Sequence, residues 1–514
     1  MTALKLLAVV VAVVATGLAD VRWLRVAQRE HYLPGTVSRF ALRWWLGFGP
    51  NRVLAVAAVL GVVLSPVSPL GGVVGAAGIA VGPFGYSLRG RSPGPMVLTP
   101  RLRTVAAVTV FVQVVIIAAA AVLGAAVPVA ALMALVAPLV MDGALAILRP
   151  VEDHKAQRYV DAARTRLQQV APTVVAITGS YGKTTTKVYA AHLIAATRTV
   201  VPTPASFNNR AGLSRAINEN LVPGTDVFIA EMGTYGPGEI AELCSWCPPR
   251  VAAITAIGPV HLERFGDEDA IVRAKSEILD GAEIVVLNVD DPRLAAVADA
   301  RAAAGVQVVR CSTEDPAADV AVRAVDGRVL VTRAGEPVAD LDPLDVPLGN
   351  VAVAVALSFA VGVPVSAVAT GLPHLPPVAS RGALTTLSTG ATAIDDTFNS
   401  NPAGCRAALA TLARLGRDDH KRVVVTPGMV ELGTRQAEAN AAFAAQAATL
   451  ATHLVIVAHT NRAALLAGVG QVPPEGRAAV LVVDTHEAAV AWVKVNTSDG
   501  DVVLYENQLP DHYA

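Results

Sequence analysis

The pattern of apolar and charged residues divides the chain near residue 150. No charged residue occurs between Val53 and Leu88 or between Thr104 and Met141, and a shorter apolar run covers Leu6 to Ala19. A bilayer crossing needs about 20 apolar residues, so each long stretch can hold two helices joined by a tight turn. The pattern therefore predicts about five membrane-spanning helices, at residues 3–19, 53–67, 70–87, 104–124 and 127–148.

Arginines mark one side of this predicted membrane region. They are concentrated in two basic loops, 20–52 and 88–103, whereas the turns inside the paired spans carry no charge. Because Lys and Arg are enriched in cytoplasmic loops, both loops and everything after Arg149 are expected in the cytoplasm. A cleaved signal peptide is the alternative for the first apolar run, but no small-residue cleavage site follows it. We therefore expect a multi-pass membrane protein with cytoplasmic catalytic domains.

Beyond residue 150, short β-rich runs alternate with alanine-rich stretches of helical length. This alternation is typical of a parallel sheet covered by helices, and it restarts after about residue 378. We therefore predict an α-helical membrane region at 1–150, an α/β parallel-sheet domain at 151–378 and a smaller Rossmann-like α/β domain at 379–514. The expected strands are 173–177, 226–230, 251–254, 284–287, 307–309, 391–394, 422–425, 453–457, 479–483 and 501–504.

The charge balance argues against nucleic acid as a partner. The 41 Lys and Arg residues are matched by 42 Asp and Glu residues, which leaves a net charge of −1 and no basic surplus. Only 16% of the residues are charged, against roughly 25% in an average soluble domain. This deficit lies mainly in the first third of the chain, as expected for a membrane region.

The stretch TGSYGKTTTK, at 178–187, has the features of a phosphate-binding loop. It follows a predicted strand, two glycines allow backbone N–H groups to approach an anion, and a helix N-terminus favours negative charge. Only two residues separate Gly179 from Gly182, so the stretch is a variant of the common P-loop pattern. We predict that Lys183 meets the β- and γ-phosphates of ATP and that Thr184 offers a hydroxyl to Mg²⁺. A plain glycine turn before an ordinary helix is the alternative.

Two further candidates lie at predicted strand ends. Glu231 ends one strand-like run, and His261 follows the next one. Ligands gather at the carboxyl ends of strands in an open parallel sheet, so both side chains are expected near a metal that accompanies the phosphates. A purely structural role is the alternative for each residue taken alone.

Seven stretches together resemble the ordered motif series of the Mur ligases, and most of all the members that add D-alanyl-D-alanine to a UDP-N-acetylmuramoyl-tripeptide. The resemblance covers roughly residues 170–435. The stretches are TGSYGKTTTK at 178–187, FNNRAG at 207–212, AEMG and GEI within 230–240, GPVHLERFG at 258–266, AKSEI at 274–278, LNVDDP at 287–292 and IDDTFNSNP at 394–402.

This resemblance implies an ATP-dependent ligase that forms an amide bond through an acyl phosphate. Phosphorylation by ATP gives a carboxylate a good leaving group, which an amine can then displace. Positioning and charge neutralisation supply most of the catalysis in such phosphoryl transfers. The expected partners are therefore ATP, Mg²⁺, a carboxylate substrate from peptidoglycan synthesis in a bacterial cell, and an amine substrate.

The resemblance also assigns roles position by position. Lys183, His261 and Lys275 match the catalytic residues of the family. The residues expected at the nucleotide are Gly179, Ser180, Gly182, Lys183, Thr184, Thr185, Asn288, Arg381 and Asp395. The residues expected at Mg²⁺ are Thr184, Glu231, His261 and Lys275, the last as a carbamate that would act as a carboxylate-like ligand. For Lys275, an ordinary solvated helix lysine is the alternative.

The chain departs from the family pattern at both ends. A membrane region stands where the soluble ligases have a small UDP-binding domain, and the stretch 504–513 stands where they usually have a Lys-Gly-Ser-like sequence near the incoming amine. We therefore hypothesise a lipid-linked muropeptide as the acid substrate. Two alternatives remain open: the same chemistry on another acid, such as a poly-amino-acid or a secondary metabolite, and a degenerate ligase that serves as a membrane scaffold or nucleotide sensor.

Overall fold

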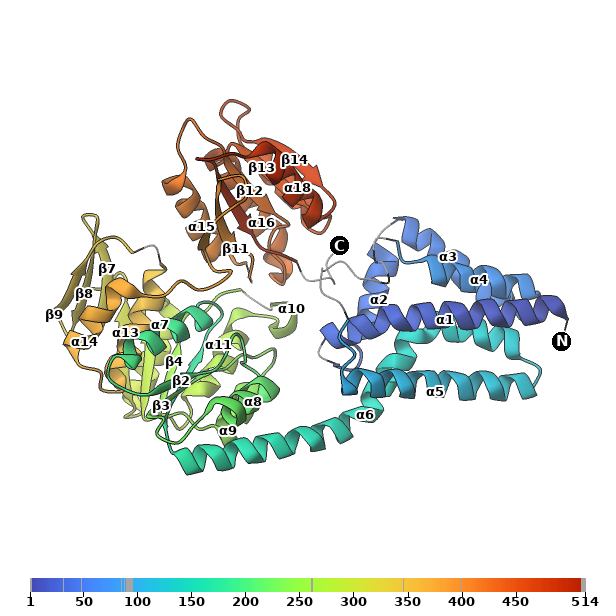
Figure 1. Cartoon of the computed structure of the whole chain (residues 1–514), viewed down its shortest axis with the longest axis horizontal. Helices are drawn as coiled ribbons and strands as arrows, with labels where there is room; N and C mark the ends of the chain where they lie inside the picture. The colour runs from blue at the N-terminus through green and yellow to red at the C-terminus, as the bar shows by residue number, and fades with distance from the viewer. Residues whose placement is uncertain are drawn as a thin grey trace. The chain divides into compact units, whose positions relative to one another are not determined.

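The computed structural model describes residues 2–509 apart from residues 31, 48, 85, 87, 89–95, 260, 261, 345 and 399. The chain forms two compact units, one built by residues up to Lys155 together with Leu509 and the other by Ala156–Gln508. Figure 1 shows helices in the first unit and two sheets flanked by helices in the second. The fold class predicted from the sequence is confirmed, while the domain bounds near 150 and 378 remain predictions.

Apolar helices make up the first unit. Three of them are long and apolar enough to cross a membrane, and a bent helix pair raises that number to at most four among the described residues. The spans expected at 53–67 and 70–87 correspond to helices of only 16 and 13 residues, so the number of five spans remains a prediction. The helices are α1 (Ala3–Arg29), α2 (Thr36–Gly47), α3 (Gly49–Leu64), α4 (Pro69–Val81), α5 (Pro100–Val122) and α6 (Ala126–Val170).

Most of the segment 20–52, expected as a basic connection between spans, is helical. Helix α1 continues to Arg29, and α2 buries Val37, Phe40, Ala41 and Trp44, which recur at helical spacing. The ring of Trp23 on α1 meets Phe40 edge to face, with 6.3 Å between the ring centroids. Burial of this apolar stripe stabilises α2 although arginines lie on its other face.

Buried polar side chains in this unit are paired between helices. Asp142 of α6 accepts hydrogen bonds from the backbone N–H groups of Val37 and Ser38, the first residues of α2 after Thr36, at 3.3 and 2.9 Å. Gln113 of α5 donates to Asp20 of α1 at 3.0 Å. Because an unpaired polar group in an apolar environment is costly, these contacts fix the register of the helices they join.

A nine-stranded sheet forms the centre of the second unit. Its strand order is β2-β3-β1-β4-β5-β6-β7-β8-β9, and the pairs from β2 to β7 are parallel. An antiparallel extension, β7 to β9, which the sequence pattern did not predict, completes the sheet. The strands are β1 (Thr173–Thr178), β2 (Val200–Pro202), β3 (Val227–Glu231), β4 (Val251–Ile254), β5 (Ile284–Asn288), β6 (Gln307–Ser312), β7 (Val320–Val325), β8 (Arg328–Arg333) and β9 (Glu336–Leu341).

Helices cover both faces of this sheet because successive strand residues point to opposite sides. Val175 and Ile177 of β1 join one apolar cluster, and Val174 and Ala176 join the other. The first cluster is closed by α7 (Lys183–Ala195), α13 (Leu348–Ala360), α14 (Val365–Gly371) and η2 (Leu372–His374). The second is closed by the end of α6 and by α8 (Arg210–Asn220), α9 (Glu239–Trp246), α10 (Leu262–Phe265), α11 (Glu268–Ser276), η1 (Glu277–Leu279) and α12 (Pro292–Ala303).

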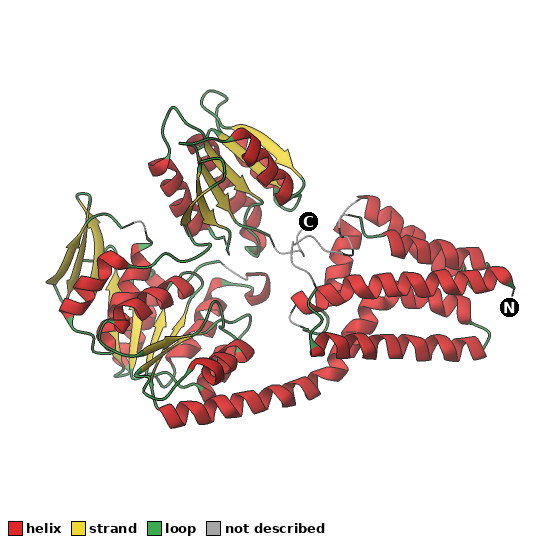
Figure 2. Cartoon of the chain, viewed as in Figure 1, coloured by secondary structure: helices red, strands yellow, loops and turns green. Residues whose placement is uncertain are grey.

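The end of the second unit has its own sheet flanked by helices, as Figure 2 shows. This sheet has six strands in the order β10-β11-β15-β12-β13-β14. All neighbouring strands are parallel except β10 and β11. The strands are β10 (Ala383–Thr386), β11 (Thr392–Asp396), β12 (Arg422–Thr426), β13 (His453–Val457), β14 (Ala479–Val483) and β15 (Val502–Glu506). The helices are α15 (Pro402–Leu415), η3 (Gly433–Arg435), α16 (Gln436–Leu450), α17 (Arg462–Val469) and α18 (His486–Asn496).

Candidate active site

The strand order of the central sheet reverses at β1. Strands β3 and β4 flank β1 and run parallel to it, so the carboxyl ends of all three meet at one edge. Ligands of open parallel sheets collect beyond this edge, at the strand where the order reverses. The loop after β1 and the final residue of β3 are therefore the natural place to build a site.

The loop after β1 requires glycine at two positions. Gly182, which precedes α7, has a φ of +77°, and a Cβ there would collide with Asn350 Oδ1. A Cβ on Gly179 would collide with Thr255 Oγ1. Ser180, also predicted at the nucleotide, donates its backbone N–H to Ala256 O at 2.7 Å. The loop leads straight into the N-terminus of α7, which is the arrangement that suits an anion.

Lys183 folds back over this loop. Its ammonium donates a hydrogen bond to Gly179 O at 2.7 Å. Burial lowers the pKa of Lys183 to about 8, an effect that Glu231 opposes and Arg381 adds to. The ammonium of Lys183 is therefore hydrogen-bonded to Gly179 O in this state, and an entering phosphate has to compete with that carbonyl for it.

Glu231 is the centre of the polar contacts at this edge. It is buried at the end of β3, and its Oε2 accepts hydrogen bonds from Thr184 Oγ1 and Lys187 Nζ, both at 3.0 Å. Its Oε1 accepts from Asn208 Nδ2 at 3.1 Å. The structure thus brings together Thr184 and Glu231, two of the residues predicted to hold Mg²⁺.

The donor set suits Mg²⁺ only if other ligands complete it. Within the part of the chain that the structure describes, no group of three or more His, Cys, Asp or Glu side chains could hold a metal ion. Hydroxyl and carboxylate oxygens are the hard donors that Mg²⁺ takes, usually together with substrate phosphates. Thr184 and Glu231 therefore fit a cation that shares its ligands with a nucleotide.

Lys275 lies in the interior instead of on a solvated helix face. It is 3% exposed near the end of α11, and no hydrogen bond or ion pair of its ammonium occurs among the described residues. Burial, and next the charge of Lys183, hold the pKa of Lys275 well below its ordinary value. The lysine is thus stabilised in its neutral form.

The other residues predicted at the nucleotide or the metal lie at different places relative to the carboxyl edge of the central sheet. Thr185 is buried in α7 beside Thr184. Asn288 ends β5, where its Oδ1 accepts the backbone N–H of Asp290 at 3.1 Å. His261, predicted as a metal ligand and catalytic residue, lies outside the described residues.

Arg381 reaches this edge from the segment that leads into the second sheet. Its Nη2 donates to Thr184 Oγ1 at 3.3 Å. Asp395, also predicted at the nucleotide, is occupied locally and accepts from Ser380 Oγ at 3.0 Å and from Thr397 Oγ1 at 2.6 Å. Its neighbour Asp396 interacts electrostatically with Arg381, and burial, followed by Glu506, raises its pKa to about 7.

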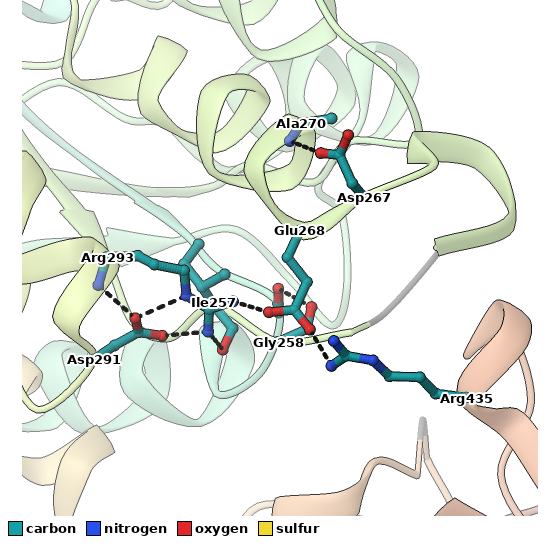
Figure 3. Close-up of polar contacts among 9 residues, drawn as sticks. Ile257, Gly258, Asp267, Glu268, Ala270, Asp291, Arg293 and Arg435 are labelled. Carbon is teal, nitrogen blue, oxygen red and sulfur yellow. Dashed lines mark hydrogen bonds and ion pairs between the residues drawn. The ribbon is translucent and has the colours of Figure 1, made fainter. Parts of the chain in front are cut away.

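A second set of polar contacts links α11 to the C-terminal part of the unit. Glu268 at the start of α11 pairs with Arg293 and, at 2.7 Å, with Arg435, as Figure 3 shows. Arg293 is itself held by Asp291, with Nη2 2.8 Å from Oδ2. Because α11 also contains Lys275, these contacts connect the C-terminal part to a helix of the site.

Sequence reasoning missed three residues that face this edge: Lys187, Asn208 and Asp396. Lys187 follows Lys183 by four residues, so the helical period alone places both on one face of α7. Asn208 lies in the quoted stretch FNNRAG, but nothing in its spacing identifies a carboxylate partner. Asp396 directly follows the predicted Asp395, and only the structure shows which of the two meets Arg381.

Comparison with known proteins decides the family. The Mur ligase middle domain matches residues 177–335, and the Mur ligase glutamate ligase domain matches residues 381–505. A UDP-N-acetylmuramoyl-tripeptide--D-alanyl-D-alanine ligase from Mycobacterium tuberculosis is 32% identical over 364 residues, which are 65% of this chain and 69% of that enzyme. The chain belongs to the Mur ligase family.

Other Mur ligases extend this result. The UDP-N-acetylmuramoyl-tripeptide--D-alanyl-D-alanine ligase of Mycobacterium leprae is 36% identical over 260 residues, which are 47% of this chain and 50% of that enzyme. Among solved structures, MurF from Acinetobacter baumannii has a TM-score of 0.58 at 24% identity, covering 69% of this chain and 77% of that one. MurF from Thermotoga maritima in complex with ADP has a TM-score of 0.57 at 25% identity, covering 69% and 80%. Mur ligases are ATP- and Mg²⁺-dependent carbon–nitrogen ligases, and this chain is one of them.

Proposed function

We propose that this Mur ligase is membrane-anchored and joins an amine, D-alanyl-D-alanine or a related one, to a carboxylate of a peptidoglycan precursor through an acyl phosphate. The hydrogen bond of Thr184 to Glu231 at the carboxyl edge of the central sheet is the main support. It pairs two hard oxygen donors directly beside the loop of Lys183. The names of the relatives support the choice of D-alanyl-D-alanine.

In this proposal the loop and its flanking residues hold ATP. The backbone of Gly179, Ser180 and Gly182 accepts the phosphates at the N-terminus of α7, which favours negative charge. Lys183 exchanges its contact with Gly179 O for the β- and γ-phosphates. The other nucleotide residues are Thr185, Asn288, Arg381 and Asp395, with Thr184 shared between nucleotide and metal.

Mg²⁺ would be held by Thr184 and Glu231 together with His261 and Lys275. When bound, it neutralises phosphate charge, which is its usual contribution to phosphoryl transfer. Lys275 enters this set as a carbamate. Its neutral nitrogen attacks the carbon of CO₂ and loses one proton, so the side chain changes from a potential cation to an anion. The burial and lowered pKa of Lys275 support this assignment.

Two substitutions make up the reaction. A carboxylate oxygen of the acid attacks the γ-phosphorus of ATP, the bond to the β-phosphate oxygen breaks, and ADP leaves. The amine nitrogen then attacks the carbonyl carbon of the acyl phosphate, loses a proton, and phosphate leaves with the electrons of the broken C–O bond. In this proposal Lys183 and Arg381, which both interact electrostatically with Glu231, stabilise the transferred charge.

The helical unit favours an acid that stays at the membrane. Helices α1, α5 and α6 meet the length and composition of membrane spans, and both matched family domains begin after α6. We therefore propose a multi-pass protein of the bacterial cell membrane, with its ligase domains in the cytoplasm and a lipid-linked muropeptide as the acid. A poly-amino-acid or another lipid-linked acid is the second candidate, favoured by the same extra unit.

The test uses detergent-purified full-length protein with ATP and Mg²⁺. A UDP-linked and a lipid-linked muropeptide are each offered with D-alanyl-D-alanine, and ADP, phosphate and the mass of the product are measured. The expected result is one ADP and one phosphate per amide formed, with the lipid-linked acid preferred. If neither muropeptide is consumed with any amine, the peptidoglycan assignment fails. Incubation with fractionated lipid and soluble pools of a cell extract then identifies another acid by the mass of its adduct.

A further inference from the structure

Lys187, the last residue of TGSYGKTTTK, has no role in the proposed reaction, yet its ammonium contacts both Glu231 and a backbone carbonyl at the site. Its ammonium lies 3.0 Å from Glu231 Oε2 and donates to Ala205 O at 2.5 Å. Both partners of the ion pair are buried, with side-chain exposures of 3% for Lys187 and 1% for Glu231. If the ammonium moved away, the buried carboxylate would lose its compensating charge, which is costly.

The carboxylate of Glu231 is therefore largely occupied before any ligand arrives. Oε2 accepts from both Lys187 Nζ and Thr184 Oγ1, and Oε1 accepts from Asn208 Nδ2. A cation that binds Glu231 must share this carboxylate with an ammonium that stays within a few ångströms. Like charges at such distances repel strongly in a buried site, where water screens them poorly.

The wider charge balance acts in the same direction. Three cationic side chains, Lys183, Lys187 and Arg381, interact electrostatically with the single carboxylate of Glu231. Before Lys275 is carbamylated, three formal positive charges face the one carboxylate of Glu231, and Asp396 offsets only part of the charge of Arg381. This excess of positive charge disfavours a lone divalent cation. The phosphates of a nucleotide reverse this balance, because they bring several negative charges and further oxygen ligands.

We propose that Lys187 is the resident counter-ion of Glu231 and sets the order of binding, so that a divalent cation enters with the nucleotide phosphates and not before them. This inference rests on the proposed function in taking Glu231 as a metal ligand. It makes Lys187 a positioning residue, which acts on the metal through Glu231. A purely structural alternative is that Lys187 only braces Ala205, whose φ of +41° is unusual for a residue other than glycine.

The test measures Mn²⁺ binding by the loss of the electron paramagnetic resonance signal of free Mn²⁺, with detergent-purified full-length protein and no substrate turnover. Without nucleotide, the wild type is expected to bind Mn²⁺ weakly. Wild type and ADP together should bind Mn²⁺ at least tenfold more tightly than ADP alone does. K187M removes the ammonium but keeps the length of the side chain, and should bind Mn²⁺ without nucleotide at least tenfold more tightly than the wild type. K187R keeps the charge and should behave as the wild type.

Two further variants separate charge from bracing. K187Q is neutral but keeps an N–H donor for Ala205 O, so a gain of Mn²⁺ binding like that of K187M points to the charge. In the double variant K187M/E231Q the gain should disappear, which locates the Mn²⁺ at Glu231. Melting temperatures show which variants are folded.

The outcomes distinguish this inference from the proposed function. If ADP brings no additional Mn²⁺ to the wild type, the metal site of the proposed function fails. If ADP does so but the wild type already binds Mn²⁺ equally well without it, the order of binding proposed for Lys187 is refuted. Equal nucleotide-free affinities of wild type, K187M and K187Q refute it as well.

Discussion

Arg381 Nη2 donates a hydrogen bond to Thr184 Oγ1 across 3.3 Å, which joins the start of the C-terminal domain to the phosphate-loop helix. The guanidinium is largely buried, and burial lowers its pKa although Glu231 opposes the shift. R381M should therefore lower kcat by at least about tenfold, because a preorganised cation at the phosphates is lost. The matched control is R417M, since Arg417 is 69% exposed and forms its ion pair with Asp419, which is exposed too. Equal ATP turnover by R381M and R417M would contradict the role of Arg381.

Lys183 gives the sharpest test of the phosphate loop. K183M removes the ammonium that now bonds to Gly179 O, and ATP turnover should fall by ~10²–10³-fold, as for other lost electrostatic donors. K494M, at an exposed position in the last turn of α18, is the control and should leave turnover unchanged. Retained turnover in a folded K183M protein would refute the phosphate role.

Gly182 is constrained both by its left-handed backbone and by the close approach of Asn350, and Gly281 serves as a control that has only the first constraint. In G182A the left-handed backbone costs about 1–2 kcal/mol, and the new Cβ also meets Asn350 Oδ1. Gly281 has a similar φ of +79° with no atom within 4 Å of its Cβ position, so G281A should pay only the backbone cost. G182A should therefore lose ADP binding, measured by calorimetry, whereas G281A keeps it. Removing the clash with N350A should restore part of the stability of G182A.

The contacts of Glu268 differ in strength because their exposures differ. Arg435 is 61% exposed, so R435M should cost at most about 1 kcal/mol in unfolding free energy. E268Q weakens the pairs with both Arg293 and Arg435, and Arg293 is only 31% exposed. Its expected cost is larger, roughly 1–3 kcal/mol. Thermal unfolding of the two variants compares these values, and an R435M cost above that of E268Q would contradict the shared role of Glu268.

Asp396 makes the stability of the catalytic unit depend on pH. Its pKa is raised from 3.8 to about 7, first by burial and next by Glu506. Between these values the folded state holds a proton that the unfolded chain has lost, so stability is greatest at low pH and falls as pH rises toward 7, by at most ~1.4 kcal/mol per unit. D396N has no such proton. The melting temperature of the wild type should therefore fall more steeply than that of D396N between pH 5.5 and 7.5, and parallel curves would disprove the effect.

The sequence predicted those parts of the fold that depend on period and on strand ends. All five strands expected in the first α/β domain are present, because each is a short run rich in β-branched or small residues, and each except β6 is followed by a helix. The site residues Thr184 and Glu231 could be placed together for the same reason, since the carboxyl ends of neighbouring parallel strands meet. The antiparallel extension β7 to β9 was missed, because partly exposed strands lack a continuous apolar run.

What the sequence could not show are contacts between distant segments. Helix α2 lies in a segment rich in arginine. Its apolar stripe is buried against Trp23 on α1 and the rest of the bundle, and these contacts cannot be seen in the local sequence. From the sequence, Lys187 is an ordinary helix lysine. Only the structure shows that Glu231, at the end of β3, forms an ion pair with it. The choice between Asp395 and Asp396 likewise depends on where Arg381 lies in space.

The last turns of α6 have a practical consequence for preparing the ligase part alone. Val160, Ala163 and Leu167 are buried in the same apolar cluster as Leu213 and Ile217 of α8. A fragment cut just before β1 would leave this cluster open to water and invite aggregation. A soluble version should therefore start near Ala156, where the compact catalytic unit begins, and retain the last turns of α6.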